Sequence, residues 1–294
     1  MVSLNVDYVD DGKKITTFIT SKYPELNINN LYKALRKKDI KINGKRVNNN
    51  VCIHYGDVVE VYIDNNILNG IHKNLNIQKI YEDSNILVVN KPKNIEVEGK
   101  SSLTEILEKE YNFIKACHRI DRNTIGLVIF AKNEKILNEF INLFKNFEIE
   151  KHYIACCYGI SKVKSKKLTG YLFKDKKKKI VYISETPKKG YVKIETSYKV
   201  IEENKEKKVS LLDVNLHTGR THQIRAHLAF SSLPIIGDGK YGSYEINKRF
   251  NENTQLLASY SITFHISSPD STLYYLNNTT IKLKKIPFTE VLEN

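Results

Sequence analysis

The sequence predicts an α+β fold, in which a larger domain built around a mixed sheet follows a smaller domain of helices and strands. From about residue 78 to residue 290, strand-like and helix-like patterns alternate along the chain. A polar, asparagine-rich stretch over residues 65–77 separates this part from a compact segment over residues 12–64. We therefore expect two domains, 12–64 and 78–294, joined by a linker at 65–77.

The first domain is predicted to contain two helices followed by two strands. Residues 14–22 carry apolar side chains at helical spacing. A second helix is expected to run to Lys38 from Asn29 or Asn30, either of which can cap it. Two short strands follow over residues 40–42 and 58–63, with Asn43 and Gly44 as the turn after the first. The pattern indicates a small α/β unit.

Basic side chains gather on the second of these helices and on the turn after the next strand. Seven Lys or Arg residues and one acidic residue, Asp39, lie within residues 31–47. On a helix and an adjacent turn, four of them could form one patch that faces phosphates: Lys33, Arg36, Lys37 and Lys45. The alternative is an ordinary solvated surface.

The larger domain is predicted to alternate strands and amphipathic helices. Strands are expected over residues 86–89, 126–131, 153–158 and 209–216. A helix is expected over 134–147, where apolar residues share one face. A second helix over 222–230 can be capped by Thr221. Residues 162–179 hold nine lysines and one aspartate, and indicate a basic loop or hairpin that is either solvated or faces RNA.

Composition and charge limit the classes of function. The chain has 47 Lys or Arg residues against 33 Asp or Glu residues, a formal net charge of +14. This excess favours a polyanionic partner, although a lysine-rich proteome would produce it too. No apolar run approaches the roughly 18–20 residues that cross a bilayer, and the first residues lack a signal-peptide pattern. We therefore expect a cytoplasmic protein without a membrane partner.

A first group of polar residues lies immediately before a predicted strand, over residues 118–124. Asp121 lies between Arg119 and Arg122, so at least one guanidinium could hold its carboxylate ionised. Loops at the ends of strands often display catalytic groups on a rigid scaffold. An ionised and sheltered carboxylate can act as a nucleophile or as a base. The alternative for Asp121 is a surface ion pair at a turn.

A second group occupies residues 216–228, around the start of the last predicted helix. Arg225 is adjacent to the apolar Ile224, so it could lie at the edge of the buried face and reach a partner carboxylate. Three histidines, His217, His222 and His227, are spaced by five residues, which turns each of them by about 140° on a helix. They therefore share no face that could bind a metal, and no metal site is predicted.

Five strings in this part of the chain, in this order and spacing, resemble the RluA-like family of RNA pseudouridine synthases. They are Leu87-Val-Val-Asn-Lys-Pro92, His118-Arg-Ile-Asp-Arg-Asn-Thr-Ile-Gly126, Lys151-His-Tyr153, Thr218-Gly-Arg-Thr-His-Gln-Ile-Arg225 and Pro234-Ile-Ile-Gly-Asp-Gly-Lys-Tyr-Gly242. The resemblance implies a catalytic core on a mixed, mainly antiparallel sheet with flanking helices. Asn94 stands where the family usually has Gly, and Asn also tolerates the left-handed region.

The first domain resembles an S4 RNA-binding domain. The resemblance rests on the basic helix, on Lys37-Lys-Asp-Ile-Lys-Ile-Asn-Gly-Lys-Arg-Val47, and on Tyr55-Gly-Asp-Val-Val-Glu-Val61. Asn29 and Asn30 stand where such domains usually have Ser-Arg. An S4 domain in front of the synthase core is a common arrangement in the RluA-like family, so the two resemblances support each other.

The resemblance assigns a role to four residues of the larger domain. Asp121 matches the catalytic aspartate, and Arg119 matches the arginine that fills the gap left by the flipped nucleotide. Tyr153 matches the tyrosine that stacks near the target uracil and takes part in proton removal in some proposals. Arg225 matches the basic residue that pairs with the aspartate. Catalysis is therefore expected of Asp121, Tyr153 and Arg225, and RNA binding of Arg119.

The implied reaction converts a uridine in RNA to pseudouridine. The glycosidic bond breaks, the uracil turns, and its C5 bonds to the ribose C1′, so no cofactor or metal is expected. The target must be flipped out of its stack before it can be rearranged. The expected partner is ribosomal RNA of the large subunit, with transfer RNA as the second choice, and the expected state is a monomer. Two other functions stay open, a non-catalytic RNA-binding protein and a carboxylate-dependent hydrolase.

Overall fold

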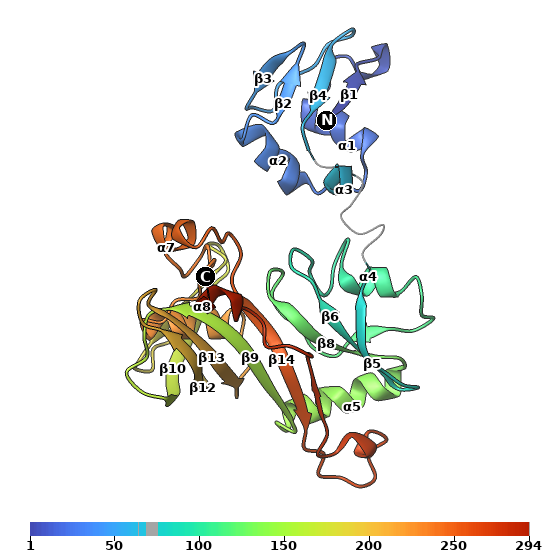
Figure 1. Cartoon of the computed structure of the whole chain (residues 1–294). Helices are drawn as coiled ribbons and strands as arrows, with labels where there is room; N and C mark the ends of the chain where they lie inside the picture. The colour runs from blue at the N-terminus through green and yellow to red at the C-terminus, as the bar shows by residue number, and fades with distance from the viewer. Residues whose placement is uncertain (64, 69–75, 294) are drawn as a thin grey trace. The chain divides into compact units, whose positions relative to one another are not determined.

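The structure is a computed structural model that describes residues 1–63, 65–68 and 76–293 of the 294-residue chain. The chain divides into two compact units, Met1–Asn76 and Ile77–Asn294. Figure 1 draws both units, and each is described here by itself. Within the described residues, none of the helices has the length and apolar character that crossing a bilayer requires.

The first unit packs two helices against a four-stranded antiparallel sheet. The strand order is β1 (Val2–Asn5), β4 (Val58–Val61), β2 (Ile40–Ile42) and β3 (Lys45–Val47). A short 3₁₀ helix (Tyr8–Asp10) precedes α1 (Ile15–Lys22) and α2 (Ile28–Arg36). Both helices bury apolar faces, with Phe18 and Leu31 fully buried among strand residues such as Val59. The predicted pair of helices and the strand over 40–42 are confirmed.

The first unit extends beyond the predicted limits of 12–64 at both ends. Strand β1 pairs with β4 in front of residue 12, and helix α3 (Asn65–Leu68) buries Leu68 in the unit's core. Residues 65–68 are therefore not linker, while residues 69–75 of the expected linker lie outside the described residues. The cap of α2 is Asn27, whose side chain accepts the Asn29 amide, rather than Asn29 or Asn30.

The second unit is built on an eleven-stranded mixed sheet. Its strands pair antiparallel throughout the described residues, except that β14 and β8 run parallel. The order is β11 (Ile180–Ser184), β10 (Ser165–Asp175), β12 (Val192–Asn204), β13 (Val209–Leu216), β9 (Ile149–Tyr158), β14 (Leu257–Phe264), β8 (Ile125–Ala131), β6 (Ile86–Lys91) and β5 (Gln78–Glu82), with β15 (Thr280–Lys282) on β14 and β7 (Lys115–Ala116) on β8. The predicted α+β fold on a mixed, mainly antiparallel sheet is confirmed.

Helices flank this sheet and connect its strands. They are α4 (Leu103–Leu107), α5 (Glu134–Lys145), α6 (Gln223–Phe230), α7 (Tyr244–Arg249), α8 (Glu290–Glu293) and a 3₁₀ helix at Tyr274–Leu276. The helix predicted over 134–147 ends two residues early, because Phe147 adopts a left-handed φ of 59°. The helix predicted over 222–230 begins after His222, and Thr221 does not cap it. The lysine-rich stretch 162–179 forms most of a hairpin, β10–β11.

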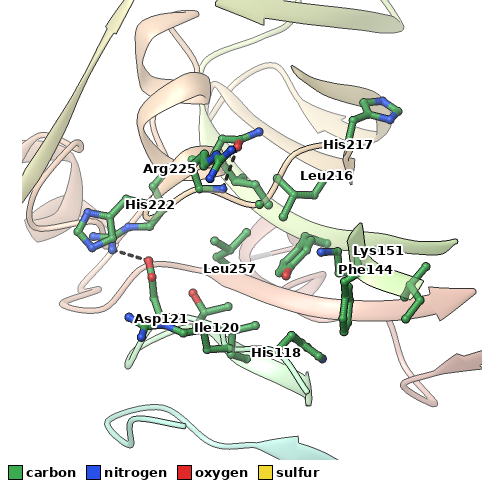
Figure 2. A pocket seen from close by; sticks show the side chains of 18 of the residues that line it. His118, Ile120, Asp121, Phe144, Lys151, Leu216, His217, His222, Arg225 and Leu257 are labelled. Atoms are coloured by element: carbon green, nitrogen blue, oxygen red, sulfur yellow. Dashed lines mark hydrogen bonds and ion pairs between the residues drawn. The ribbon is translucent and has the colours of Figure 1, made fainter. Parts of the chain in front are cut away.

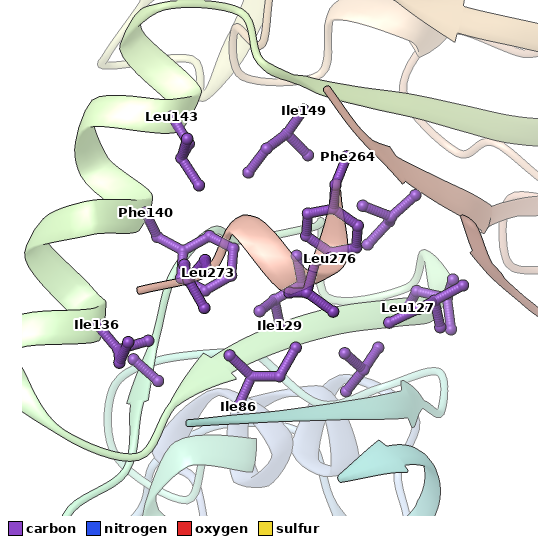
Figure 3. Packing of buried hydrophobic residues seen from close by; sticks show 14 of the residues in the cluster. Ile86, Leu127, Ile129, Ile136, Phe140, Leu143, Ile149, Phe264, Leu273 and Leu276 are labelled. Atoms are coloured by element: carbon purple, nitrogen blue, oxygen red, sulfur yellow. The ribbon is translucent and has the colours of Figure 1, made fainter. Parts of the chain in front are cut away.

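Helix α5 is fixed by a continuous apolar core. Ile136, Phe140 and Leu143 project from one face of α5 toward Ile86 on β6 and Ile129 on β8, as Figure 3 shows. All five side chains are buried, and Phe140 also meets Phe264 of β14 edge to face, with ring centroids 6.4 Å apart. The burial of each side chain of this size stabilises the folded protein by about 1.5–3 kcal/mol. The end of α5 is therefore held in a defined place.

The parallel pairing of β8 and β14 brings the two polar groups of the sequence together. Tyr153 on β9 lies opposite Ser259 on β14, and Ser259 lies opposite Gly126 on β8. Gly126 has φ of 106°, and a side chain there would collide with the Ser259 backbone. The loop that carries Asp121 enters β8 at this junction, so the register sets Asp121 beside the strand that carries Tyr153.

Candidate active site

A cavity of about 360 Å³ opens where this loop, strand β9 and helix α6 converge. Figure 2 shows Asp121, His222 and Arg225 toward one side of it and Phe144, Lys151 and His217 toward the other. Its lining comes from the loop before β8, the end of α5, strands β9, β13 and β14, and the turn that leads into α6. Four residues singled out from the sequence line it together: Arg119, Asp121, Tyr153 and Arg225.

One guanidinium links two carboxylates at the edge of this cavity. Arg225 Nη1 donates to Asp121 Oδ2 at 2.7 Å, while its Nε and Nη2 donate to the two oxygens of Asp238 at 2.7 and 2.9 Å. The paired bonds to Asp238 fix the plane of the guanidinium. The third bond therefore holds Asp121 in one orientation. Asp121 keeps a side-chain exposure of 27%, so it stays open to the cavity.

Asp238 is a functional residue that the sequence analysis left without a role. It is fully buried, and its Oδ1 also accepts the backbone amides of Lys240 and Tyr241. Gly237 makes this possible, because a side chain there would collide with the carbonyl of Thr254. The signal in the sequence was an aspartate between two glycines, Gly237 and Gly239, in a string that otherwise reads as a buried turn.

Electrostatics keep Arg225 and Asp238 charged. Burial alone would raise the pKa of Asp238, but the hydrogen bonds from Arg225 and two backbone amides hold it below its usual value. For Arg225, burial opposes the charged form, and both carboxylates outweigh it and raise the pKa above the usual arginine value. Arg225 and Asp238 therefore form a buried charged pair behind the carboxyl group of Asp121.

A buried lysine holds the loop that carries Asp121. Lys91 is fully buried, and its Nζ donates to the carbonyls of Pro92, Ile95 and Arg122 at 2.8–2.9 Å. Burial lowers the pKa of Lys91 to about 7, against the attraction of Asp121. Three acceptors require all three protons of the ammonium group. The ammonium of Lys91 therefore fixes the backbone one residue after Asp121.

Tyr153 lies on the inner side of β9 and is nearly buried, with 5% exposure. Its ring belongs to an apolar cluster that includes Ile224 of α6 and Leu257 of β14. Burial, reinforced by the negative charge of Asp121, raises the pKa of Tyr153 above the usual tyrosine value. The phenol is therefore protonated at neutral pH, and its ring offers a flat apolar wall to the cavity.

His222 joins the cavity to the lysine-rich hairpin. Tyr241 Oη accepts the Val181 amide of β11 at 2.8 Å and lies 2.8 Å from His222 Nδ1. The hydroxyl proton of Tyr241 is then available for Nδ1, which leaves the imidazole proton on Nε2. Burial lowers the pKa of His222 to about 4, so the ring is neutral. The Tyr241 ring also lies 5.3 Å from the Arg225 guanidinium.

Lys151 and His118 line the side of the cavity away from Asp121. The Lys151 ammonium lies 5.0 Å from the Phe144 ring centroid, and burial lowers the pKa of Lys151. His118 Nε2 accepts the Ile129 amide at 3.1 Å, and burial together with the Lys151 charge lowers the pKa of His118 to about 3. His118 is therefore a neutral structural residue, and Lys151 is a cation that faces the cavity.

The two arginines that flank Asp121 in sequence do not hold its carboxylate. Arg122 is exposed and donates to the Asn94 carbonyl at 3.1 Å. Arg119 is exposed and lines the cavity, with no ion pair to Asp121 within the described part of the chain. The prediction that a flanking arginine holds Asp121 is therefore wrong, because Arg225 makes that contact from 104 residues away.

A second cavity, of about 870 Å³, shares part of its lining with the first. Arg119, Asp121, His222 and Arg225 line both cavities. The second cavity adds the cations Arg122 and Lys240 together with the acids Glu96 and Glu98. Arginines and a lysine beside a smaller pocket with apolar walls suit a phosphate-bearing chain with one base inserted.

The three histidines spaced by five residues diverge. His217 Nε2 lies 2.8 Å from Ser197 Oγ, His222 meets Tyr241, and His227 Nδ1 lies 3.1 Å from Thr196 Oγ1. Across residues 1–63, 65–68 and 76–293, no three His, Cys, Asp or Glu side chains group as metal ligands do.

The four basic residues predicted to bind RNA in the first unit are all exposed: Lys33, Arg36, Lys37 and Lys45. Lys33 and Arg36 lie on the solvent side of α2, since Leu31, Ala34 and Leu35 face the core. Lys37 is the C-cap of α2, and Lys45 begins β3. Residues three and four apart share a helix face, so Lys33 can act together with Arg36 and Lys37.

The chain is similar in sequence to known RNA pseudouridine synthases. The family model described as RNA pseudouridylate synthase matches residues 85–230. An uncharacterized RNA pseudouridine synthase of Mycoplasma capricolum subsp. capricolum is 34% identical, over 96% of this chain and 97% of that protein. Ribosomal large subunit pseudouridine synthase C of Buchnera aphidicola subsp. Baizongia pistaciae is 31% identical, over 89% and 88% respectively.

Solved structures show the same fold. Human RNA pseudouridylate synthase domain containing 4 superposes with a TM-score of 0.60 at 18% identity, covering 74% of this chain and 93% of that one. Human RNA pseudouridylate synthase domain containing 1 has a TM-score of 0.57 at 21% identity, with the same coverage.

Proposed function

We propose a mechanism and a substrate from one premise: the chain belongs to the RluA-like family of RNA pseudouridine synthases. In this proposal, Asp121 starts the cleavage of the glycosidic bond of a uridine that has been flipped into the smaller cavity. The observation that carries it is the ion pair between Asp121 and the buried Arg225, in which Asp121 stays open to the cavity that Tyr153 also lines.

The reaction needs no atoms beyond those of the nucleotide. The bond between N1 and C1′ breaks, the uracil turns within the cavity, and C5 bonds to C1′. The proton leaves C5, and N1 ends with a proton. Tyr153 packs against the uracil ring, a role that its raised pKa favours over that of a base. Arg225 holds Asp121 charged and aimed throughout.

Arg119 supports base flipping in this proposal. Its side chain is exposed and lines both cavities, at the place where a nucleotide would leave the RNA stack. A planar guanidinium can stack and donate hydrogen bonds in the space that the target vacates. The cations of the second cavity would bind the neighbouring phosphates and contribute salt-sensitive affinity.

The substrate proposed is large-subunit ribosomal RNA. Relatives named ribosomal large subunit pseudouridine synthase C align along most of this chain, which supports that choice over transfer RNA. The first unit would act as an S4-like RNA-binding domain, with Lys33, Arg36, Lys37 and Lys45 on phosphates. A cytoplasmic monomer is the state proposed for this role.

Pseudouridine mapping in cells tests the activity and the substrate together. RNA from cells that lack the gene is compared with RNA from cells complemented by wild-type protein or by Asp121→Asn. We expect one or more large-subunit sites to disappear and to return only with wild-type protein. Sites that return with Asp121→Asn would contradict the mechanism, and a lost transfer RNA site would redirect the substrate.

A further inference from the structure

The turn that ends α5 is closed in an unusual way at the rim of the active-site cavity. The Glu148 amide donates to the Leu143 carbonyl at 2.9 Å and the Phe147 amide to the Phe144 carbonyl at 3.3 Å. This is a Schellman turn, with Phe147 at the position that adopts a left-handed φ of 59°. Glycine is the usual residue there, because a side chain is strained in that region.

Three other helices in the described part of the chain end in the same turn. The left-handed position is taken by a small or flexible polar residue in each of them: Lys38 after α2, Ser232 after α6 and Asn251 after α7. Asparagine enters this region more readily than most residues, whereas a bulky aromatic is an outlier. The turn after α5 therefore holds a residue that local backbone preference disfavours.

Phe147 is also not explained by packing. Its side chain is 70% exposed, whereas Phe140 and Leu143 of the same helix are buried in the core. The exposed ring lines the cavity that holds Asp121. A strained and exposed aromatic residue lowers the stability of the fold and gains no evident stabilising contact within the protein. This points to a contact with another molecule.

The surroundings of Phe147 indicate what that contact is. The cation of Lys151 and the edge of His217 line the same cavity, and Phe144 lies one helical turn before Phe147. Exposed aromatics interleaved with cations are the surface on which unpaired bases stack while their phosphates are neutralised. Helix α5 is anchored by its buried face, so the ring is presented from a fixed support (Figure 3).

We propose that Phe147 is a stacking platform for a nucleobase that flanks the target uridine in the RNA substrate. This rests on the proposed function, because it requires RNA at the cavity. The ring both lines the cavity and is largely exposed, so it would hold a base that stays outside while the uridine enters. The strain at φ 59° then persists because it aims the ring at the RNA.

The test combines a protein variant with a scan of the RNA. The probe is an unmodified stem-loop transcript of large-subunit ribosomal RNA that wild-type protein binds. In a set of RNAs, each nucleotide near the target is replaced in turn by an abasic residue. Affinity is measured in the Asp121→Asn background, so that the target stays uridine. The variants are Phe147→Gly, Phe147→Leu and Phe147→Trp.

We expect Phe147→Gly to weaken binding of the intact RNA by about 5- to 150-fold, the range that stacking on one base supplies. Its melting temperature should equal or exceed that of the parent, because glycine relieves the left-handed strain. One of the RNAs with a flanking abasic residue should bind the parent protein more weakly than intact RNA by the same factor. That RNA should bind Phe147→Gly no more weakly than intact RNA binds Phe147→Gly. Phe147→Trp should keep the affinity, and Phe147→Leu should lose it.

Asn251→Gly is the matched control, because it changes the same position of the same kind of turn away from the cavity. It should leave RNA affinity unchanged. Phe147→Gly that binds every RNA like its parent, or that loses the same factor on every abasic RNA, would overturn the proposal. Affinity and isomerisation are measured separately. If Phe147 and one flanking base depend on each other for binding, but wild-type protein isomerises none of the RNAs, the result counts against the proposed function instead.

Discussion

At the scale of single residues, the site depends on one guanidinium shared by two unequal carboxylates. Asp238 is fully buried and makes two of the three bonds to Arg225, whereas Asp121 makes one and stays partly exposed. The buried carboxylate therefore positions the arginine, and the arginine positions the carboxylate for which we propose the catalytic role. A lysine could not replace Arg225 here, because the bridge uses three N–H groups that the planar guanidinium holds in a fixed geometry.

The substitution Asp238→Asn tests whether Asp238 positions Arg225, and through it Asp121. The amide cannot balance the buried guanidinium, so we expect the free energy of unfolding to fall by about 3–5 kcal/mol, as when a buried pair loses one partner. Turnover at saturating RNA should fall as well, while RNA affinity holds. Urea unfolding and single-turnover kinetics measure both. Asp270→Asn, on an exposed loop outside the cavity, is the control, and a variant indistinguishable from it would contradict the assigned role.

Some residue roles could be predicted from sequence motifs, whereas others depend on contacts that exist only in the folded protein. Asp121, Tyr153 and Arg225 came from motifs, and the structure brings them to one cavity. The family resemblance pointed to Arg225 as the partner of Asp121, and the structure shows that ion pair. Reading the neighbouring residues alone pointed to a flanking arginine instead, because a contact that spans 104 residues leaves no local pattern. The role of Asp238 was missed because a buried aspartate reveals its partner only after folding. Asn94 does adopt the left-handed φ, 69°, that its place in the motif required.

At the scale of elements, the lysine-rich hairpin β10–β11 is tied to the site. Tyr241 receives the Val181 amide, the Lys240 ammonium donates to the Lys179 carbonyl at 2.7 Å, and Lys174 donates to Thr221 at 3.3 Å. The lysines at its turn are exposed. The hairpin therefore presents cations beside the cavity from a fixed position.

Replacing two of those lysines, Lys176 and Lys177, by Gln should weaken RNA binding and reduce its dependence on salt. The slope of log affinity against log salt should fall by about 1 for each phosphate contact removed. Turnover at saturating RNA should hold. The control removes two positive charges elsewhere on the second unit, by Lys284→Gln together with Lys285→Gln. Equal effects of the two pairs would mean that net charge, rather than the hairpin, attracts the RNA.

The outer face of β9 and β13 holds a titrating network that faces away from Tyr153. His152 Nδ1 lies 2.7 Å from Asp213, and its Nε2 lies 3.1 Å from Glu150, which also meets His265 at 3.2 Å. The hydrogen bond with Asp213 raises the pKa of His152, against burial. Burial would raise the pKa of Glu150, but hydrogen bonds from His265, His152 and Asn215 hold it below its usual value.

This network should make stability depend on pH. The His152 contribution is complete below the ordinary histidine pKa of 6.5 and is lost as pH rises through the raised value. The Glu150 contribution is complete above the ordinary value of 4.5 and is lost as pH falls through the lowered one. The urea midpoint of wild type should exceed that of Asp213→Asn by more at about pH 5.5 than at about pH 9. An equal difference at both values would show that the charge on His152 contributes nothing to the stability of the fold.

Element boundaries were predictable where pattern and burial coincide. The strand over 40–42 and the strand over 209–216 match the structure at both ends. Other strands are displaced at one end, since those predicted over 58–63, 86–89, 126–131 and 153–158 lie at 58–61, 86–91, 125–131 and 149–158. The errors in the helices fall where a local cap decides. Helix α5 was extended to Phe147 because its apolar spacing continues there, and the start of α6 was assigned a Thr221 cap that the left-handed His222 replaces.

At the scale of the whole molecule, the sequence predicted two units and a mixed sheet, and the structure shows both. It did not predict the strand order or the single parallel pair among the described strands, β8 with β14, because pairing between distant segments leaves no local pattern. That pair sets the loop of Asp121 beside Tyr153. The topology, more than any motif, therefore builds the site.

The central claim is that Asp121 carries the chemistry while other residues carry the binding. The most direct measurement compares wild-type protein with Asp121→Asn on one unmodified large-subunit transcript, recording affinity and single-turnover pseudouridine formation. Because Arg225 keeps its pair with Asp238, we expect affinity to change by less than about threefold and the rate to fall by about 10⁴-fold or more. A rate within about tenfold of wild type would contradict the account.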